Sequence, residues 1–425
     1  MKKTLLILSF FFTAVILTGQ ENQAAAVKKV ITIEDAVSLA CQNNVSIQKQ
    51  KINLNLLDKK NKTSWNSISP SASLSAGYNP SLEDNTPSTW SLSANVNLSL
   101  TPSLYTAING ARINYENGLI TYDTAVRTVE LNVRKLFYNL ILTKENIALQ
   151  ERNLETARQR YNANRERFNR GQLSELDLLT SQYNYESLKP NLENASINYD
   201  NSLASFKQMT GIPLEQEIEL KGSLDDFTAT GDINVEYNID EIPSIKSLHL
   251  QLQNAKNNLL STRFSVWGPS LSAGYTYSLT GNDATDKTQT RNSITLGLRL
   301  PLDGYLPWST GAMNIETQKA NLQTMELQYK DEKDSADINI QTKIRQIKQS
   351  KSQLKILSSN VELAQKTYNM TLTAYNHGSK DLLTLQTAAD NLLKAKTNEQ
   401  SQLYSLISAI LDLENTLGVP FGTIK

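Results

Sequence analysis

The side chains that most often carry catalysis or bind metals are scarce in this chain. Its two histidines, His249 and His377, lie in different segments, and its single cysteine, Cys41, cannot form an intramolecular disulfide. Zinc sites and nucleophilic sites are built from clustered His and Cys residues, and the usual motifs of proteases, hydrolases and nucleotide-binding loops are absent. The 42 acidic residues could supply a carboxylate pair for glycoside hydrolysis, but no pattern singles out two of them. The sequence therefore predicts a protein that is not an enzyme and that needs neither a metal nor another cofactor.

The composition of the chain indicates which kind of secondary structure it forms. The 425 residues include 42 basic and 42 acidic residues, so the net charge gives no bulk attraction to nucleic acid. The apolar fraction of 39% is low for a compact domain, and glycine and proline are few. This composition is typical of long, solvated helices and water-lined surfaces.

The N-terminus has the pattern of a secretory signal peptide. Two lysines precede an apolar run at residues 5–17, and small residues follow at 24–26. We expect residues 1–26 to form this peptide, with cleavage near residues 19–26. The alternative, an uncleaved membrane anchor, needs about 20 apolar residues, and this run is shorter. Cys41 lies too far downstream to be a lipid-attachment cysteine, and its neighbours predict a packed thiol on an amphipathic helix.

One phrase, SLSAGY, occurs twice, at residues 73–78 and 270–275, each time shortly after a proline. Residues 90–100 alternate apolar and polar side chains without a break, which predicts a strand with one apolar and one polar face. The same alternation runs through both copies of the phrase and through residues 293–300. The four runs predict two β-hairpins.

The length of these strands, about ten residues, suits a tilted strand that crosses a membrane with its apolar face toward lipid. The hairpin tips are polar, at residues 81–89 and 281–291, and we expect them to face the cell exterior. The structural alternative is half of a soluble β-sandwich, but no other strands of comparable clarity supply a second sheet.

Long helices make up the rest. A heptad seam predicts a coiled coil in a helix of about residues 105–169, which at about 1.5 Å per residue is nearly 100 Å long. Gly171 marks its end, and a second helix at 173–210 returns to the stop Gly211-Ile212-Pro213. The seam positions are Val126, Val129, Val133, Leu136, Leu140, Thr143, Ile147, Gln150, Leu154, Ala157, Tyr161, Asn164 and Phe168.

This helical pair repeats with an offset of about 207 residues, so that Gly171 matches Gly378 and Gly211 matches Gly418. The chain is thus predicted to be a tandem duplication of helix, hairpin, long helix and returning helix. We expect a first repeat at residues 27–213, an acidic linker at 214–240, a second repeat at 241–420 and a short tail at 421–425.

Four strands cannot close a barrel, because a sheet in lipid must satisfy both of its edges and the smallest barrels have eight strands. The chain must therefore oligomerise, and three copies would give twelve strands. The long helices leave every hairpin from the same side and would project together as a helical tube.

In these features the chain resembles the TolC family of outer-membrane efflux and type I secretion channels. The resemblance covers essentially all of the mature chain. It rests on the first-helix opening, the two hairpins that begin after proline, the close of the second hairpin, the helix turns and the two stops. The residues concerned are Thr32–Ala36, Pro70, Pro269, Leu300–Gly304, Arg167-Phe168-x-x-Gly171-x-x-Ser174, Tyr375-x-x-Gly378, Gly211–Pro213 and Gly418–Pro420.

The resemblance implies an α+β membrane protein: a homotrimer with a twelve-stranded transmembrane β-barrel in outer-membrane lipid and a helical α-barrel crossing the periplasm. It also implies docking to a periplasmic adaptor (membrane fusion) protein and to an inner-membrane transporter of the RND, ABC or MFS type. Drug efflux, metal efflux and protein secretion all use such an exit duct. Nucleic acid is not an expected partner. The chain ends soon after the second stop, so a small equatorial belt is expected.

The resemblance also places the functional site at the periplasmic tips of the helices. The turns there are short and polar and each contains a glycine, so another backbone could approach them closely. By position, the adaptor-docking residues are Gly171, Ser174, Gly378, Ser379 and Asp381, and the gate candidates are Asp177, Tyr375 and Lys380. Thr384 and Thr387 stand where relatives can carry a ring of carboxylates, so a cation-selective acidic ring is not expected. Two alternatives stay open at this point, a secreted coiled-coil structural protein and an adhesin-like trimer.

Overall fold

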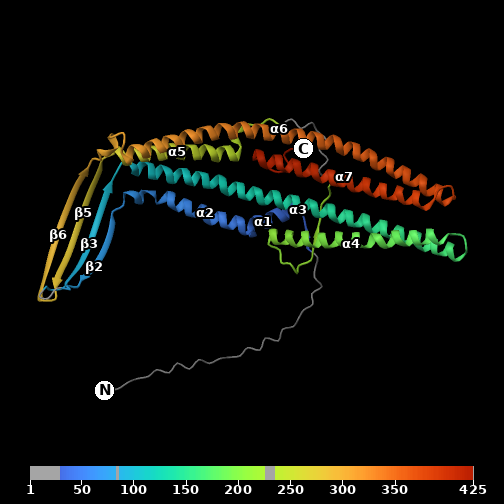
Figure 1. The fold of residues 1–425 in the computed structure, drawn as a ribbon, viewed down its shortest axis with the longest axis horizontal. Coiled ribbons are helices and arrows are strands. Elements are labelled where there is room, and N and C mark those ends of the chain that lie inside the picture. The colour runs from blue at the N-terminus through green and yellow to red at the C-terminus, as the bar shows by residue number, and fades with distance from the viewer. Residues whose placement is uncertain (1–28, 83–85, 225–234, 425) are drawn as a thin grey trace, which may run out of the picture.

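The computed structural model describes residues 29–82, 86–224 and 235–424, so the expected signal peptide at 1–26 lies outside the described residues. The molecule is elongated, with all long strands at one end and two helix–helix turns at the other (Figure 1). Within the described ranges, no helix combines the length and the hydropathy that a membrane-spanning helix needs.

The four predicted strands are confirmed as one antiparallel sheet. They are β2 (Ser71–Asn79), β3 (Thr89–Leu100), β5 (Ser270–Asn282) and β6 (Thr285–Arg299), in the order β2-β3-β5-β6. The register sets apolar residues opposite one another: Leu74 faces Ala94, Val96 faces Tyr275, and Tyr275 faces Ile294. Over these rows one face of the sheet is apolar, and Leu74, Ile294 and Leu296 are more than 70% exposed on it. Nearer the tip, β6 adds the polar residues Asn292 and Thr290 to this face, opposite Tyr277 and Leu279.

The second hairpin is longer than the sequence pattern predicted. Residues 281–291 were expected to form a loop, but β5 runs to Asn282 and β6 starts at Thr285, which leaves a two-residue tip. Asn282 closes this turn because its Oδ1 accepts hydrogen bonds from the backbone N–H and the hydroxyl of Thr285, at 2.9 and 2.7 Å. Polar threonines in this stretch hid a strand that has no apolar alternation. In the first tip, residues 83–85 lie outside the described part.

The long helices of the two repeats have equal lengths. Helix α3 (Ser103–Asn169) and helix α6 (Thr310–Asn376) each have 67 residues, and α4 (Glu175–Thr210) and α7 (Leu382–Leu417) each have 36. The expected starts at residues 105 and 173 were each off by two residues. The repeat boundaries themselves stay a prediction.

The short helices that precede each hairpin differ between the repeats. The first repeat has α1 (Ile33–Asn43) and α2 (Val45–Lys62), separated at Asn44, whose side chain accepts the N–H of Ser46 at 2.9 Å and so caps α2. The second repeat has the single helix α5 (Pro243–Trp267). The described part of the chain also has the 3₁₀ turns η1 (Ser64–Ile68), η3 (Ile239–Glu241) and η4 (Asp303–Tyr305).

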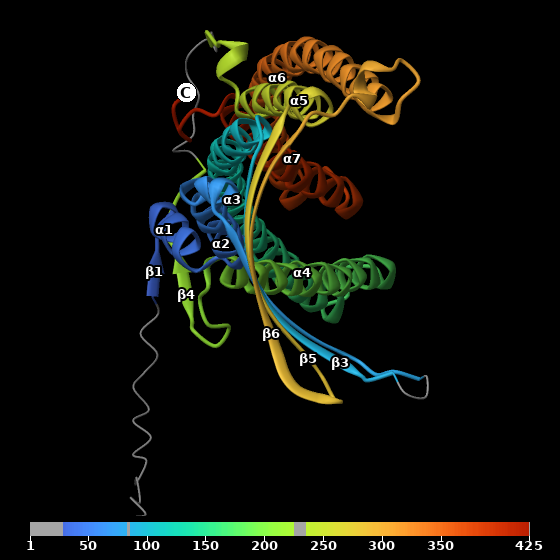
Figure 2. The same ribbon diagram turned by 90° about the vertical axis from the view of Figure 1, so that its left-hand side faces the viewer.

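Part of the predicted linker forms a small sheet that the sequence reading missed. Strand β4 (Ile218–Leu220) pairs in parallel with β1 (Lys29–Ile31), and both lie beside α1 on one side of the helices (Figure 2). Residues 225–234 of the linker lie outside the described part. Beneath this sheet, Phe137, Leu140, Phe206 and Ile407 are at most 1% exposed and form the main core between α1, α3, α4 and α7.

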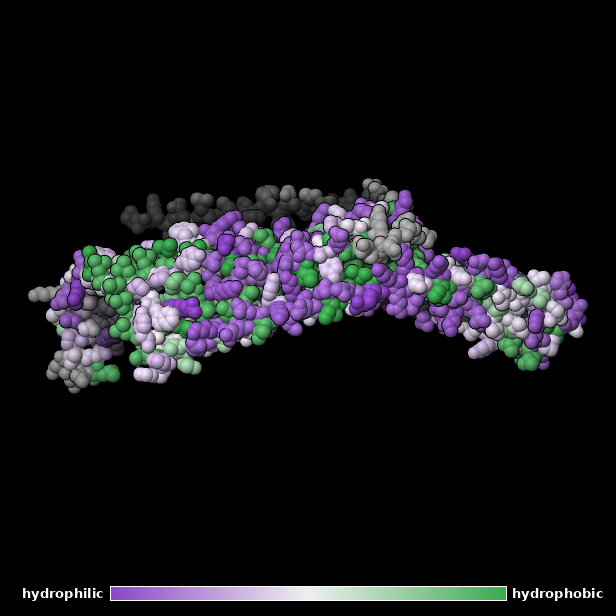
Figure 3. All heavy atoms as spheres, turned by 90° about the horizontal axis from the view of Figure 1, so that it is seen from above, coloured by the Kyte–Doolittle hydropathy of each residue, from purple (hydrophilic) through white to green (hydrophobic). Residues whose placement is uncertain are grey.

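Hydrophobic side chains also gather where the strands meet the helices, whereas hydrophilic residues prevail along much of the long helices (Figure 3). The exposed residues of this region include Leu300, Leu302, Leu306 and Trp308 in the connection between β6 and α6. The Nε1–H of Trp267 donates to the carbonyl of Gly304 at 3.0 Å and holds this connection against the end of α5.

Candidate functional site

The two predicted site turns lie together at the end of the molecule farthest from the strands. One joins α3 to α4 and the other joins α6 to α7 (Figure 1). Each connects a 67-residue helix to a 36-residue helix. At about 1.5 Å per residue, the long helix alone separates the turn from the sheet by about 100 Å.

The first turn is built around Gly171. This residue has φ of 70°, a left-handed conformation that glycine adopts without steric penalty. Its N–H donates to the carbonyl of Phe168 at 2.8 Å, and the N–H of Gln172 donates to that of Arg167 at 2.9 Å, which closes the end of α3. A Cβ added at Gly171 would meet no atom within 4 Å, so its surface is open.

Ser174 and Asp177 form a reciprocal cap at the start of α4. The Oγ of Ser174 accepts the backbone N–H of Asp177 at 3.1 Å and donates its own proton to Asp177 Oδ2 at 2.6 Å. The carboxylate of Asp177 also lies in the first turn of the helix, where the helix dipole favours negative charge. Two of the predicted site residues therefore have a structural task before any partner arrives.

The second turn has the same design, except that its helix cap is an aspartate, Asp381, where the first turn has Ser174. Gly378 has φ of 72°, its N–H donates to the carbonyl of Tyr375 at 2.9 Å, and Ser379 donates through both its N–H and its hydroxyl to Ala374 at 2.9 Å. Asp381 caps α7 by accepting the N–H of Thr384 at 2.8 Å. Hydrogen bonds from the side chain and backbone of Thr384 lower the pKa of Asp381, and the charge of Lys380 lowers it further.

The two gate candidates of opposite charge are not brought together within one chain. The carboxylate of Asp177 accepts the hydroxyl of Ser174, and Lys380 is exposed beside Asp381. Among the side chains that the structure describes, neither Asp177 nor Lys380 forms an ion pair. The docking residues Gly171, Ser174, Gly378, Ser379 and Asp381 all lie on the open surface of the two turns. The turns thus offer two similar, exposed polar tips.

The third gate candidate, Tyr375, joins the two repeats. Its hydroxyl, on α6, donates to Oδ1 of Asn164 on α3 at 3.2 Å, and Asn164 is only 2% exposed. One turn closer to the sheet along α3 and two turns along α6, the guanidinium of Arg160 donates to the hydroxyl of Tyr368 and lies over its ring, 5.7 Å from the centroid. Two polar links therefore tie α3 to α6 just above the tips.

Sequence reasoning did not assign roles to Arg160, Asn164 and Tyr368. A signal was present, because Asn164 stands at a position of a mostly apolar seam and Tyr368 matches the seam residue Tyr161 at the 207-residue offset. A polar residue in a seam often bonds across it. The partner Arg160 had no such signal.

A groove of about 220 Å³ lies beside these links, between α3, α6 and α7. Its lining includes the apolar residues Leu149, Leu392 and Leu393 and the basic residues Arg152, Arg160 and Lys396. In the described part of the chain, no group of three or more His, Cys, Asp and Glu side chains is placed to hold a metal ion.

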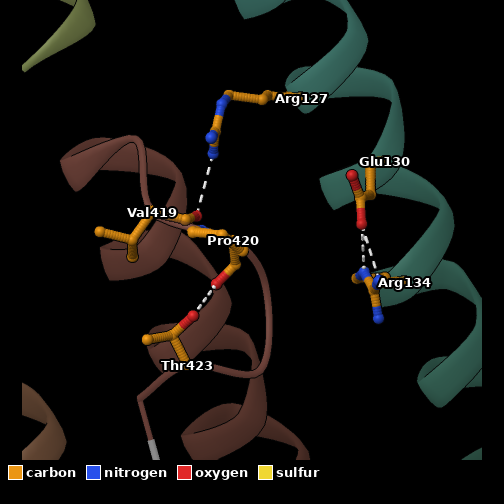
Figure 4. A network of polar contacts seen from close by, with 6 residues as sticks. All are labelled: Arg127, Glu130, Arg134, Val419, Pro420 and Thr423. Atoms are coloured by element: carbon orange, nitrogen blue, oxygen red, sulfur yellow. Dashed lines mark hydrogen bonds and ion pairs between the residues drawn. The ribbon is translucent and has the colours of Figure 1, made fainter.

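The tail after α7 folds back onto α3 and joins the repeats at mid-length (Figure 4). The guanidinium of Arg127 donates to the carbonyl of Val419 at 2.9 Å, and Arg134 pairs with Glu130 at 2.7 Å while lying over the ring of Phe421. The hydroxyl of Thr423 donates to the carbonyl of Pro420 at 2.6 Å and tightens the turn.

Known proteins share sequence similarity with this chain. A family model described as outer membrane efflux protein matches residues 36–212 and 239–419. An uncharacterized protein of Haemophilus influenzae is 28% identical over 196 residues, which span 45% of this chain but only 40% of that protein.

Solved structures share the fold at low identity. The CmeC outer membrane channel of Campylobacter jejuni is 19% identical, with a TM-score of 0.76, over 91% of this chain and 85% of its own. The open state of the Neisseria gonorrhoeae MtrE outer membrane channel is 17% identical, with a TM-score of 0.75, over 91% and 89%. The outer membrane protein VceC of Vibrio cholerae is 13% identical, with a TM-score of 0.73, over 92% and 96%.

Proposed function

Because the chain belongs to the outer membrane efflux protein family, we propose that it is the exit duct of a tripartite efflux pump or of a type I secretion system. It would pass substrates from an inner-membrane transporter across the periplasm and the outer membrane to the exterior. The family consists of channels, so the expectation that the chain is not an enzyme is confirmed. The two alternatives, a secreted structural coiled coil and an adhesin-like trimer, lose their support for the same reason.

The observation that carries this proposal is the combination of one apolar-faced sheet with two helical hairpins that leave it from the same end. Neighbouring strands are antiparallel in the order β2-β3-β5-β6, so β2 and β6 run in opposite directions. Strand β6 of one copy can therefore also pair antiparallel with β2 of the next copy. Three copies would close twelve strands, which removes every free edge from lipid.

The adaptor-docking role of the tips stays part of the proposal. Gly171 and Gly378 have open surfaces, and the Ser174 and Asp381 caps hold the turns in defined conformations. A helical hairpin of a periplasmic adaptor could therefore approach both tips and lie along the groove between α3 and α6. The basic side chains of Arg152 and Lys396, which line this groove, favour acidic side chains on such a partner.

Photo-crosslinking in cells tests this proposal. A photoreactive amino acid at Gln172 or Ser379, both exposed beside the turn glycines, should form a covalent product with a periplasmic adaptor. The same amino acid at Glu332, an exposed position in the middle of α6, serves as the control and should give none. Deletion of the gene should abolish export of the cargo of the partner transporter, and tips that capture no periplasmic protein while export continues would exclude the docking role.

A further inference from the structure

The polar face of the sheet carries two arginines. In the ladder between β5 and β6, Arg299 stands opposite Ser270 and Arg291 stands opposite Ser278. Directly opposed residues point to the same side of a sheet, and Ser270 and Ser278 belong to the row of Ser, Thr, Asn and Gly residues on the polar face. Both arginines therefore project from the side that lies opposite to the apolar, lipid-facing residues.

Among the side chains that the structure describes, no acidic residue of the four strands shares this face with them. The strands β2, β3 and β5 contain no Asp, Glu, Lys or Arg at all, and β6 contains only Asp286 and Lys287, near its tip, besides the two arginines. Arg291 and Arg299 are exposed, and among the described side chains neither forms an ion pair.

Apart from Asp286 near the tip of β6, the acids nearest in sequence lie beyond the ends of the ladder. Asp303 belongs to the connection that follows β6, and Asp283 stands at the tip, where its carboxylate accepts the hydroxyl of Tyr78 at 3.0 Å. Tyr78 lies on the apolar face, opposite Trp90. Away from the tip, the charge of the inner wall is therefore carried by the arginines.

We infer that the β-barrel is an anion-preferring segment of the duct, with Arg299 as the main determinant. The inference rests on the proposed function, since closing the sheet from three chains turns its polar face inward and places three copies of each arginine in a ring. Eight residues separate the two rings along the strand, about 26 Å at about 3.3 Å per residue.

A ring of three fixed cations acts strongly here for two reasons. The barrel wall is surrounded by hydrocarbon, and a low-dielectric wall focuses the field of its charges into the water inside. Screening confines the effect to about 8 Å at physiological ionic strength, so the tip acids, a dozen residues away along the strand, do not offset the Arg299 ring. Rings of Arg and Lys are the usual device of anion-conducting pores. Anionic and neutral cargo should therefore pass this section more readily than cationic cargo.

The substitution Ser272→Cys, in a Cys41→Ser background, tests this preference. Reagents added to intact cells would reach this thiol through the barrel, so the result does not depend on any gate at the tips. Ser272 is the next residue after Ser270 on the same face, so it lies beside Arg299. On intact cells the thiol should react faster with an anionic sulfonatoethyl methanethiosulfonate than with its cationic trimethylammonium analogue, after correction for their intrinsic rates. Arg299→Gln should lower this rate ratio at least threefold, Arg299→Lys should retain it, and the control Arg345→Gln, on α6, should not alter it.

Reversal potentials in planar bilayers give a second readout. A gradient of potassium chloride should show a preference for chloride in the wild-type channel and a weaker one, or none, in the Arg291→Gln/Arg299→Gln variant. Equal rates for the two reagents in the wild type, or a ratio that Arg299→Gln leaves unchanged, would overturn the inference and leave the duct itself intact. A thiol that reacts with neither reagent, together with a protein that forms no pores, would remove the proposed function as well.

Discussion

Lys207 and Glu414 stand at equivalent positions of the two repeats, 207 residues apart. Each binds the backbone that follows its own helix, Lys207 as a hydrogen-bond donor and Glu414 as an acceptor. The ammonium of Lys207 donates to the carbonyl of Leu214 at 2.7 Å, whereas the carboxylate of Glu414 accepts the N–H of Ile424 at 2.8 Å. Both side chains are buried, with exposed fractions of 9% and 0%. The duplication has kept the position and its task and exchanged the charge.

The buried acid makes stability depend on pH. Burial raises the pKa of Glu414, while the N–H groups of residues 422–424 and the charge of Arg134 oppose this rise. A raised pKa means that the fold favours the protonated acid, so its contribution is complete below the unfolded-state pKa and is lost as pH rises through the folded-state pKa. The melting temperature of Glu414→Gln, which never ionises, should therefore rise relative to that of the wild type as the pH increases above the ordinary glutamate pKa of about 4.3. A difference that does not change with pH would contradict this.

The links between α3 and α6 are expected to hold the tips together. Tyr375→Phe and Tyr368→Phe each remove one hydroxyl that bonds across this seam, a loss of about 0.5–1.5 kcal/mol per chain. We expect both variants to raise single-channel conductance in planar bilayers without loss of trimer. Tyr183→Phe is the matched control, because Tyr183 is 74% exposed on α4. Equal conductance in all three variants would place the gate elsewhere.

Charge at the tips is expected to have a smaller effect. Lys380→Ala should raise conductance modestly if Lys380 meets an acid such as Asp177 of a neighbouring turn in the ring, because exposed ion pairs contribute only about 0–1 kcal/mol. Asp177→Asn removes the negative charge that would meet Lys380 and keeps an oxygen for the bond from Ser174, so it separates the charge effect from loss of the helix cap. If conductance rises in neither variant, the two residues only cap and solvate the turns.

The turn glycines can be tested through their backbone alone. Gly171→Ala and Gly378→Ala add a methyl group that meets no atom within 4 Å, so any destabilisation reports the left-handed φ of 70° and 72°. The expected loss is about 1–2 kcal/mol per turn. Asn tolerates this conformation better, so Gly→Asn should recover most of the loss in thermal unfolding and in adaptor crosslinking. An alanine variant as stable as the wild type would show that the turn relaxes.

The orientation of the protein in the membrane can be tested at the short tip of the second hairpin. Ala284 lies in the two-residue turn between β5 and β6 and is exposed. Ala284→Cys, with Cys41→Ser, should react on intact cells with an impermeant thiol reagent. Labelling that begins only after the outer membrane is broken would reverse the orientation of the whole molecule.

Much of this fold could be predicted because its elements are long and periodic. Alternation over 90–100 and the heptad seam from Val126 to Phe168 each repeat one physical pattern many times, so the four strands and the long helices were found within a few residues. The β1–β4 pair was missed because two three-residue strands almost 190 residues apart leave no periodic signal. The extension of β6 was missed because TDKTQT is polar on both faces.

The site was predictable in position but not in detail. Glycines and polar residues marked the turns, yet the sequence did not reveal that Ser174 and Asp381 are equivalent caps, or that the Asp177 carboxylate accepts from Ser174. Such roles depend on which hydrogen bond forms locally. The Arg160–Tyr368 and Tyr375–Asn164 links depend on the side-by-side placement of two helices more than 200 residues apart, which no local pattern encodes.

The order β2-β3-β5-β6 has a genetic consequence. Each chain exposes two different edges, and a ring forms only if every β6 meets the β2 of a neighbour. One chain with a blocked edge, for example with proline introduced into the middle of β6, would spoil every ring that it enters. In a cell that makes intact and defective chains in equal amounts, only about one-eighth of random threefold rings would be intact. Edge mutations should therefore be dominant over the wild-type gene, whereas mutations that prevent folding altogether should be recessive.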